Sequence, residues 1–146
     1  MPKNLRQLAE DDQVAAAAAD ARTRLTTLAS ALHSTTRDVT GHPWLVEQLH
    51  ALISAMNTGQ GRHCPHIGSP TVLHGAVWAP GHLVCSLCIG DLTPDLTEDS
   101  TCDRCRRHAD PIYAGIVAVG PLLLRYGLCR HCTRRTGLGQ LDGHAA

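Results

Sequence analysis

The 146-residue sequence contains no phenylalanine, and aromatic residues make up only 3% of it. A core built on large aromatic side chains is therefore excluded, and the fold needs another source of stability. The 13 basic and 13 acidic side chains give a formal charge of zero. This balance argues against a generally basic nucleic-acid coat and against a strongly acidic tail. A chain of this length accommodates one ordinary domain or two small ones.

Long apolar runs are also missing from the sequence. No segment approaches the roughly 18 consecutive apolar residues that a membrane-spanning helix requires. The first residues lack the charged-then-apolar pattern of a secretory signal, and the alanine run at 15–19 is too weakly apolar to replace it. We therefore predict a soluble, cytoplasmic protein with no membrane partner, in which cysteines act as metal ligands rather than forming disulfides.

Residues 1–60 contain no cysteine and are predicted to form a helical hairpin. Asn4 with Gln7 three residues later is typical of a helix N-cap with a capping box. The apolar stripe that follows predicts one helix to about residue 40, and it comprises Val14, Ala18, Ala21, Leu25, Leu28, Leu32 and Val39. Pro43 suits the start of a second helix, which the glycine-rich segment 57–61 ends. The hairpin would pack its stripe on itself or on the rest of the chain, and the alternative is a homodimer through the heptad-like stripe.

The excess of metal-binding residue types is the strongest signal, with seven cysteines and ten histidines. The cysteines occur as Cys64 and as three Cys-x2-Cys pairs, which are Cys85/Cys88, Cys102/Cys105 and Cys129/Cys132. If His66 joins Cys64, the chain has eight ligands, the number that two tetrahedral zinc sites require. His63 and His82 are the alternatives to His66. We expect the other histidines, including His74, to be packing or surface groups.

The order of the ligands along the chain predicts how they share two metals. In the sequential scheme Cys64, His66, Cys85 and Cys88 form one site, and Cys102, Cys105, Cys129 and Cys132 form the other. Each site then encloses a segment that reads as strand, turn and strand, with the turns at 79–81 and 120–121. We take these segments as a degenerate internal repeat. A cross-brace, which joins Cys64 and His66 to Cys102 and Cys105, is the alternative.

The Cys-x2-Cys pairs around short hairpins in residues 64–132 resemble zinc-ribbon and zinc-knuckle proteins. The resemblance implies two zinc ions and a fold type, but no particular function. It departs from the usual pattern at Cys64-Pro65-His66, where Cys-x-His replaces Cys-x2-Cys. The expected fold is a small α+β protein, with a helical hairpin followed by two tandem zinc-ribbon-like β-hairpin modules. The modules span 61–92 and 93–136, and 137–146 is predicted to be a flexible tail.

The ligand sets favour structural over catalytic metal. A catalytic zinc keeps one coordination position open, whereas four protein ligands close the site. The sequence has no His-Glu-x2-His motif and no His-x-Glu motif of the zinc deaminases. We therefore expect a protein that is not an enzyme. Iron is the alternative metal at the four-cysteine site, and a thiol redox sensor is an alternative function.

Charge is distributed unevenly, which bears on the partner. Residues 101–146 hold seven basic and three acidic side chains. Six arginines are candidates for contact with nucleic-acid phosphates: Arg104, Arg106, Arg107, Arg130, Arg134 and Arg135. The acidic residues between the modules, among them Glu98 and Asp99, are interpreted as a solvated linker. Our first expectation is an interaction module that contacts a protein as adaptor or regulator, and the second is a DNA- or RNA-binding regulator.

Overall fold

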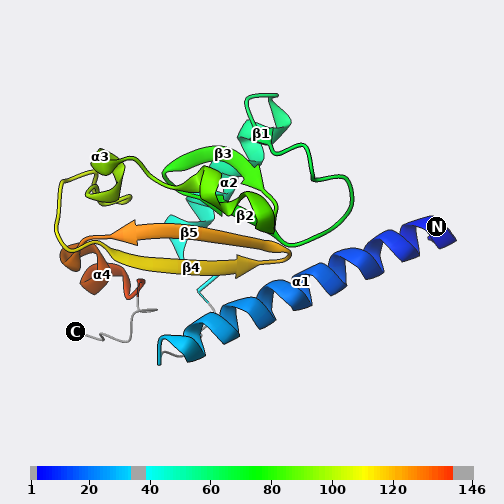
Figure 1. The fold of residues 1–146 in the computed structure, drawn as a ribbon, viewed down its shortest axis with the longest axis horizontal. Helices are drawn as coiled ribbons and strands as arrows, with labels where there is room; N and C mark the ends of the chain where they lie inside the picture. Colours follow the sequence, from blue (N-terminus) through cyan, green and yellow to red (C-terminus); the bar gives the residue numbers. More distant parts are fainter. Residues whose placement is uncertain (1–2, 34–38, 140–146) are drawn as a thin grey trace.

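A computed structural model describes residues 3–33 and 39–139, which form a mixed α+β protein with one five-stranded sheet (Figure 1). The strand order is β1-β3-β2-β5-β4. The strands are β1 (Arg62–His63), β2 (Leu73–Ala76), β3 (Ala79–Val84), β4 (Tyr113–Val119) and β5 (Leu122–Leu128). In this part of the chain, no helix has the length and apolar character needed to cross a membrane.

The two predicted hairpins are present, but they belong to a single sheet. β2 pairs antiparallel with β3, and β4 pairs antiparallel with β5. β2 also pairs in parallel with β5, from Leu73 opposite Leu122 to Ala76 opposite Arg125. The prediction of two tandem modules is therefore right about the hairpins and wrong about their separation. The parallel pairing joins the segments that the two ligand sets enclose.

The turn of the first hairpin lies two residues earlier than predicted. It falls at Val77 and Trp78, and the segment 79–81 begins β3. β3 contains Pro80, which has no N–H to donate. The strand tolerates it because β1 pairs with β3 only at His82 and Leu83. Pro80 therefore lies beyond that pairing, on an open edge where a missing N–H costs no ladder bond. The second turn is at Gly120 and Pro121, as predicted.

The first helix, α1 (Leu5–Ala31), begins as the sequence indicates. The Asn4 side chain accepts from the Gln7 N–H, and the Gln7 side chain accepts from the Asn4 N–H, so the capping box is confirmed. The helix ends well before residue 40, because Leu32 is its C-cap and His33 has a left-handed φ of 52°. Residues 34–38 of the predicted helix lie outside the described residues.

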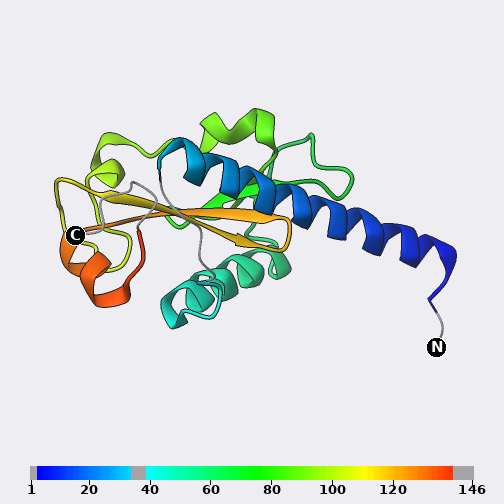
Figure 2. The ribbon, with the colours of Figure 1, turned by 90° about the horizontal axis from the view of Figure 1, so that it is seen from below.

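The two long helices cover opposite faces of the sheet (Figure 2). On one face, Ala21 of α1 packs with Val72 and Leu123. On the other, Leu45 of α2 (Pro43–Asn57) packs in the main core, whose other members include Val117, Leu124, Tyr126 and Leu128. Successive strand residues point to opposite faces, so β4 and β5 supply an apolar set to each helix. The helices therefore pack on the rest of the chain, which is one of the two arrangements predicted for the hairpin, rather than on each other.

Three short helical elements carry or flank the cysteines: η1 (Ser86–Leu92), α3 (Leu96–Asp99) and α4 (Arg130–Thr136). The residues after α4 were predicted to be a flexible tail, but Leu138 is only 1% exposed and belongs to the main core. The described chain is thus held in place to Gly139, which is also buried. The rest of the predicted tail, 140–146, lies outside the described residues.

Candidate metal centres

The structure brings the eight predicted ligands together in two groups of four. One group contains Cys64, His66, Cys85 and Cys88, and the other contains Cys102, Cys105, Cys129 and Cys132. Within each group the ligand atoms all lie within 4.8 Å of one another. This is the sequential arrangement rather than the cross-brace. Both clusters could hold a metal ion.

Site 1, the Cys64/His66/Cys85/Cys88 group, forms where β1 lies beside β3. Their parallel pairing places Cys64, just after β1, next to Cys85, just after β3, and the Cys85 N–H donates to Cys64 Sγ at 3.3 Å. His66 Nδ1 lies 3.2 Å from Cys88 Sγ and 3.8 Å from Cys85 Sγ. A tetrahedral zinc with ordinary ligand bonds sets this nitrogen–sulfur separation at about 3.6 Å. The side chains therefore fit the metal.

The other two candidate histidines are not part of this group. His63 Nδ1 donates to the Cys64 carbonyl at 2.8 Å, which directs that nitrogen to the backbone. His82 lies on β3, and its buried Nδ1 has no hydrogen-bond partner among the described residues. Among the three alternatives, His66 is thus the one that the geometry places with the thiols.

Site 2, the four-cysteine group, lies within the main core. Cys129 caps α4 and Cys132 lies in it, while Cys102 and Cys105 come from the loop before β4. Cys105 Sγ is 3.9 Å from Cys129 Sγ, near the sulfur–sulfur edge of about 3.8 Å in a tetrahedral zinc site. The same distance is far longer than a disulfide bond of about 2.0 Å. All seven cysteines are free thiols.

Asp103, which sequence reasoning missed, fastens the first loop of site 2 to β5. Its backbone N–H donates to the Gly127 carbonyl at 2.9 Å, and its Oδ2 accepts from the Gly127 N–H. Burial raises the pKa of this carboxyl group to about 6, although the Gly127 N–H acts to lower it. The signal in the sequence was its place directly after Cys102, inside a Cys-x2-Cys loop.

In each site the protein environment lowers the pKa of one thiol and raises that of another. Burial raises the pKa of Cys64, but hydrogen bonds from the Cys85 and His66 backbones outweigh it and lower that pKa to about 6. In site 2, burial is likewise outweighed by backbone N–H groups, and the pKa of Cys102 is about 7. Burial and neighbouring thiols raise the pKa of Cys88 to about 11 and of Cys132 to about 12. A bound metal ion has to displace the protons of Cys88 and Cys132.

A chain of polar contacts links site 1 to the sheet and to α1. Ser86, between Cys85 and Cys88, meets His74 Nε2 at 3.1 Å, and Arg24 of α1 donates to the same hydroxyl. Arg125 of β5 donates to His74 Nδ1 at 3.0 Å. Burial, and then the charges of Arg125 and Arg24, lower the pKa of His74 to about 4. His74 is therefore neutral, and its Nε2 carries the proton donated to Ser86.

The six arginines proposed from the sequence are all exposed and lie on the segments that carry site 2. Arg104 Nη1 approaches Cys132 Sγ at 3.6 Å, and Arg106 forms ion pairs with Glu98 at 2.7 Å and Asp103 at 3.7 Å. Within residues 3–33 and 39–139, no carboxylate forms an ion pair with the other five arginines. Arg106 is thus the one member of the set that pairs with carboxylates of the described residues.

Comparisons with protein-family models, with curated proteins and with solved structures find no match for this chain. The fold and the two clusters therefore define its class by themselves: a mixed α+β protein with two potential metal-binding sites, each with four protein ligands.

Proposed function

We propose that this is a non-enzymatic zinc protein, in which two structural zinc ions stabilise one sheet and fix the conformation of an interaction surface. The convergence of two complete four-ligand groups carries the proposal. Four protein ligands leave no coordination position for a substrate or a reactive water. A set of three thiols and one imidazole suits zinc, and we extend zinc to site 2 by analogy, with iron as the competing metal there.

Metal analysis tests this proposal directly. We expect two zinc ions per chain in the purified protein, because the eight ligands form two complete sites. His66→Ala removes one ligand from site 1 and should release one of the two ions to a chelator first. His63→Ala, next to the same loop, is the matched control and should retain both. A content of one ion or none, iron in place of zinc, or loss of metal from the control alone would contradict the proposal.

A protein partner is our first proposal for what the surface contacts. Leu87, at the tip of the Cys85–Cys88 loop, and Leu96 of α3 are each 90% exposed. Exposed leucines beside a rigid metal-bound loop are suited to apolar contact with another protein.

The second proposal is nucleic acid. It is supported by the five exposed arginines around site 2 that form no ion pair with the part of the chain that the structure describes. Arginines held near one another contact phosphates and release counterions on binding. The zinc-loaded double variant Arg107→Gln/Arg135→Gln should then bind duplex DNA at least about ten-fold more weakly, with a salt slope smaller by about two. Arg6→Gln/Arg22→Gln, on α1, is the control of equal charge. Absent or salt-independent binding, or an equal effect of both variants, would rule this out.

A further inference from the structure

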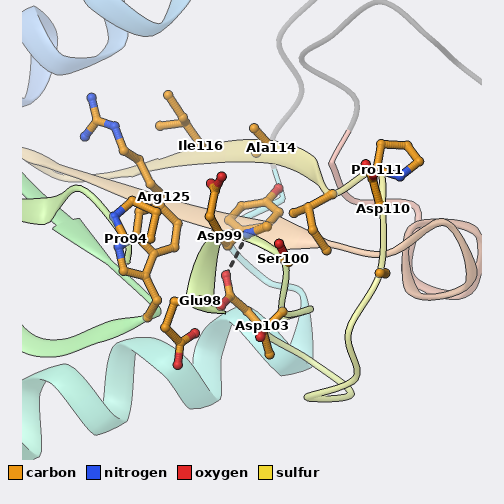
Figure 3. A pocket seen from close by; sticks show the side chains of 17 residues that line it. Pro94, Glu98, Asp99, Ser100, Asp103, Asp110, Pro111, Ala114, Ile116 and Arg125 are labelled. Atoms are coloured by element: carbon orange, nitrogen blue, oxygen red, sulfur yellow. Dashed lines mark hydrogen bonds between the residues drawn. The ribbon is translucent and has the colours of Figure 1, made fainter. Parts of the chain in front are cut away.

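A cavity of about 510 Å³, whose lining contains none of the eight candidate metal ligands, lies between the β4–β5 hairpin and the segment that carries α3 and the first loop of site 2 (Figure 3). Pro94 and Arg125 lie at one end of it, and Asp110 and Pro111 lie at the other. Ala114 and Ile116 of β4 contribute to its wall. Its volume is that of a small-molecule or side-chain pocket.

The charges around the cavity are mostly negative. Four carboxylates line it, and they belong to Glu98, Asp99, Asp103 and Asp110. Arg125 is the one basic side chain among the lining residues, and its guanidinium group points away from these carboxylates (Figure 3). Arg125 instead donates to His74 on β2. The one basic side chain of the lining thus contacts His74 and does not neutralise the four carboxylates.

Two carboxylate oxygens of the lining are buried and have no hydrogen-bond partner among the described residues. They are Asp103 Oδ1 and Glu98 Oε2. Asp103 is only 8% exposed, and the nearest cation to its Oδ1 is Arg106, which lies outside the lining and is 3.7 Å away. The other oxygen of each carboxylate is paired, since Glu98 Oε1 meets Arg106 at 2.7 Å and Asp103 Oδ2 accepts from the Gly127 N–H. The two unpartnered oxygens are therefore free to accept from a cation in the cavity, where the low dielectric strengthens the contact.

No three of these carboxylates lie close enough together to share one metal ion, so a larger cation fits the cavity better. Within the described residues, the two cysteine-rich clusters are the groups close enough to coordinate one ion. Apolar surface lies between the carboxylates, from Ile112, Ile116 and the indole of Trp78. Trp78 is held in place by its Nε1, which donates to the Leu92 carbonyl at 2.7 Å. An indole surface and alkyl walls suit a cation with a hydrocarbon stem.

We propose that this cavity binds an organic cation, an ammonium or guanidinium group on an alkyl chain. A free polyamine and a lysine or arginine side chain of a peptide share this chemistry. The cationic head is drawn by the carboxylates of α3 and the site 2 loop, and the stem lies on Trp78 and β4.

Calorimetric titration of the zinc-loaded full chain tests the proposal with two probes, spermidine and a capped peptide containing one arginine. Asp99→Asn/Asp110→Asn removes two exposed lining carboxylates that have no ion pair among the described residues. We expect this variant to bind at least about ten-fold more weakly, a change of about 1.4 kcal/mol. The control Asp12→Asn/Asp91→Asn removes the same charge away from the cavity and should change the affinity less than about two-fold.

Binding of spermidine alone would assign the cavity to a free polyamine, and binding of the peptide alone would assign it to a side chain of a partner. Absence of binding by both probes overturns the proposal. It is also overturned if the two double variants weaken binding equally, since the effect would then be one of net charge. The zinc content of every variant is measured in parallel, so that failure of the metal sites is distinguished from failure of the cavity.

Discussion

Loss of metal from site 2 is expected to unfold the main core, whereas loss from site 1 leaves that core folded. Cys102, Cys129 and Cys132 are buried in the same cluster as Leu45 and Leu128. A structural zinc contributes about 10–16 kcal/mol of apparent binding free energy, which is also folding free energy. This is as large as the whole stability of a typical domain, about 5–15 kcal/mol. Cys102→Ser should therefore abolish cooperative folding of residues 101–139.

Site 1 stands at the edge of the sheet, and its loss should act more locally. Cys64 belongs to a separate small cluster with Val84 and Leu92. Cys64→Ser is expected to free β1, the loop after it and η1, and to release the contact between Ser86 and Arg24 of α1. The β4–β5 hairpin keeps its own metal and its contacts with α2, so it stays protected.

Hydrogen exchange of the two variants and of the chelated protein distinguishes these effects. Cys64→Ser should lose protection in β1, the loop after it and η1 only, and Cys102→Ser should lose it throughout β4, β5 and α4. Chelation should reproduce the sum of both. Equal loss of protection in the two variants would contradict the assignment of the core to site 2.

The two groups of candidate metal ligands were predictable because the information that places them is local. Each Cys-x2-Cys pair needs only one tight turn, and the count of eight ligands closes two sites. The β4–β5 hairpin was predictable for the same reason, since a proline–glycine turn joins two strands that are adjacent in sequence. Asn4 and Gln7 likewise fix the start of α1 within a single turn.

The arrangement of these parts depends on contacts between distant residues, and the sequence pattern does not carry them. Leu73 pairs with Leu122, across 49 positions, and nothing in either segment alone indicates a parallel partner. The leucine- and alanine-rich stripe of α1 predicts an apolar neighbour but does not distinguish a helix from a sheet. The structure shows that the neighbour of Ala21 and Leu25 is the sheet.

The acidic segment between the metal sites shows a different limit. Glu98 and Asp99 were interpreted as part of a solvated linker because they are charged and lie between two modules. The structure leaves Asp99 exposed, as expected, but Glu98 is half-buried, because Arg106, with a left-handed φ of 59°, turns back to pair with it. Composition predicts exposure of a charged segment on average. The partial burial of Glu98 depends instead on a backbone reversal at Arg106, which composition does not indicate.

Gly115→Ala is expected to cause the largest loss of stability among substitutions outside the metal ligands. Gly115 lies opposite Tyr126 in the β4–β5 register, and the tyrosine ring covers it. A Cβ at this position would lie 2.3 Å from Cε2 and Cζ of Tyr126. The ring is held in place, because Tyr126 is 4% exposed and forms a T-shaped contact with Trp44 of α2 at a centroid distance of 5.7 Å.

Overpacking of this kind costs about 3 kcal/mol, which urea denaturation of the zinc-loaded protein measures. Gly68→Ala is the matched control, since its added Cβ meets nothing within 4 Å and should change stability by less than about 0.5 kcal/mol. Tyr126→Leu removes the clashing ring atoms, so adding Gly115→Ala to it should cost at least about 1 kcal/mol less than in the wild type. Equal costs in both backgrounds would show that backbone propensity, and not the Tyr126 ring, requires glycine in β4.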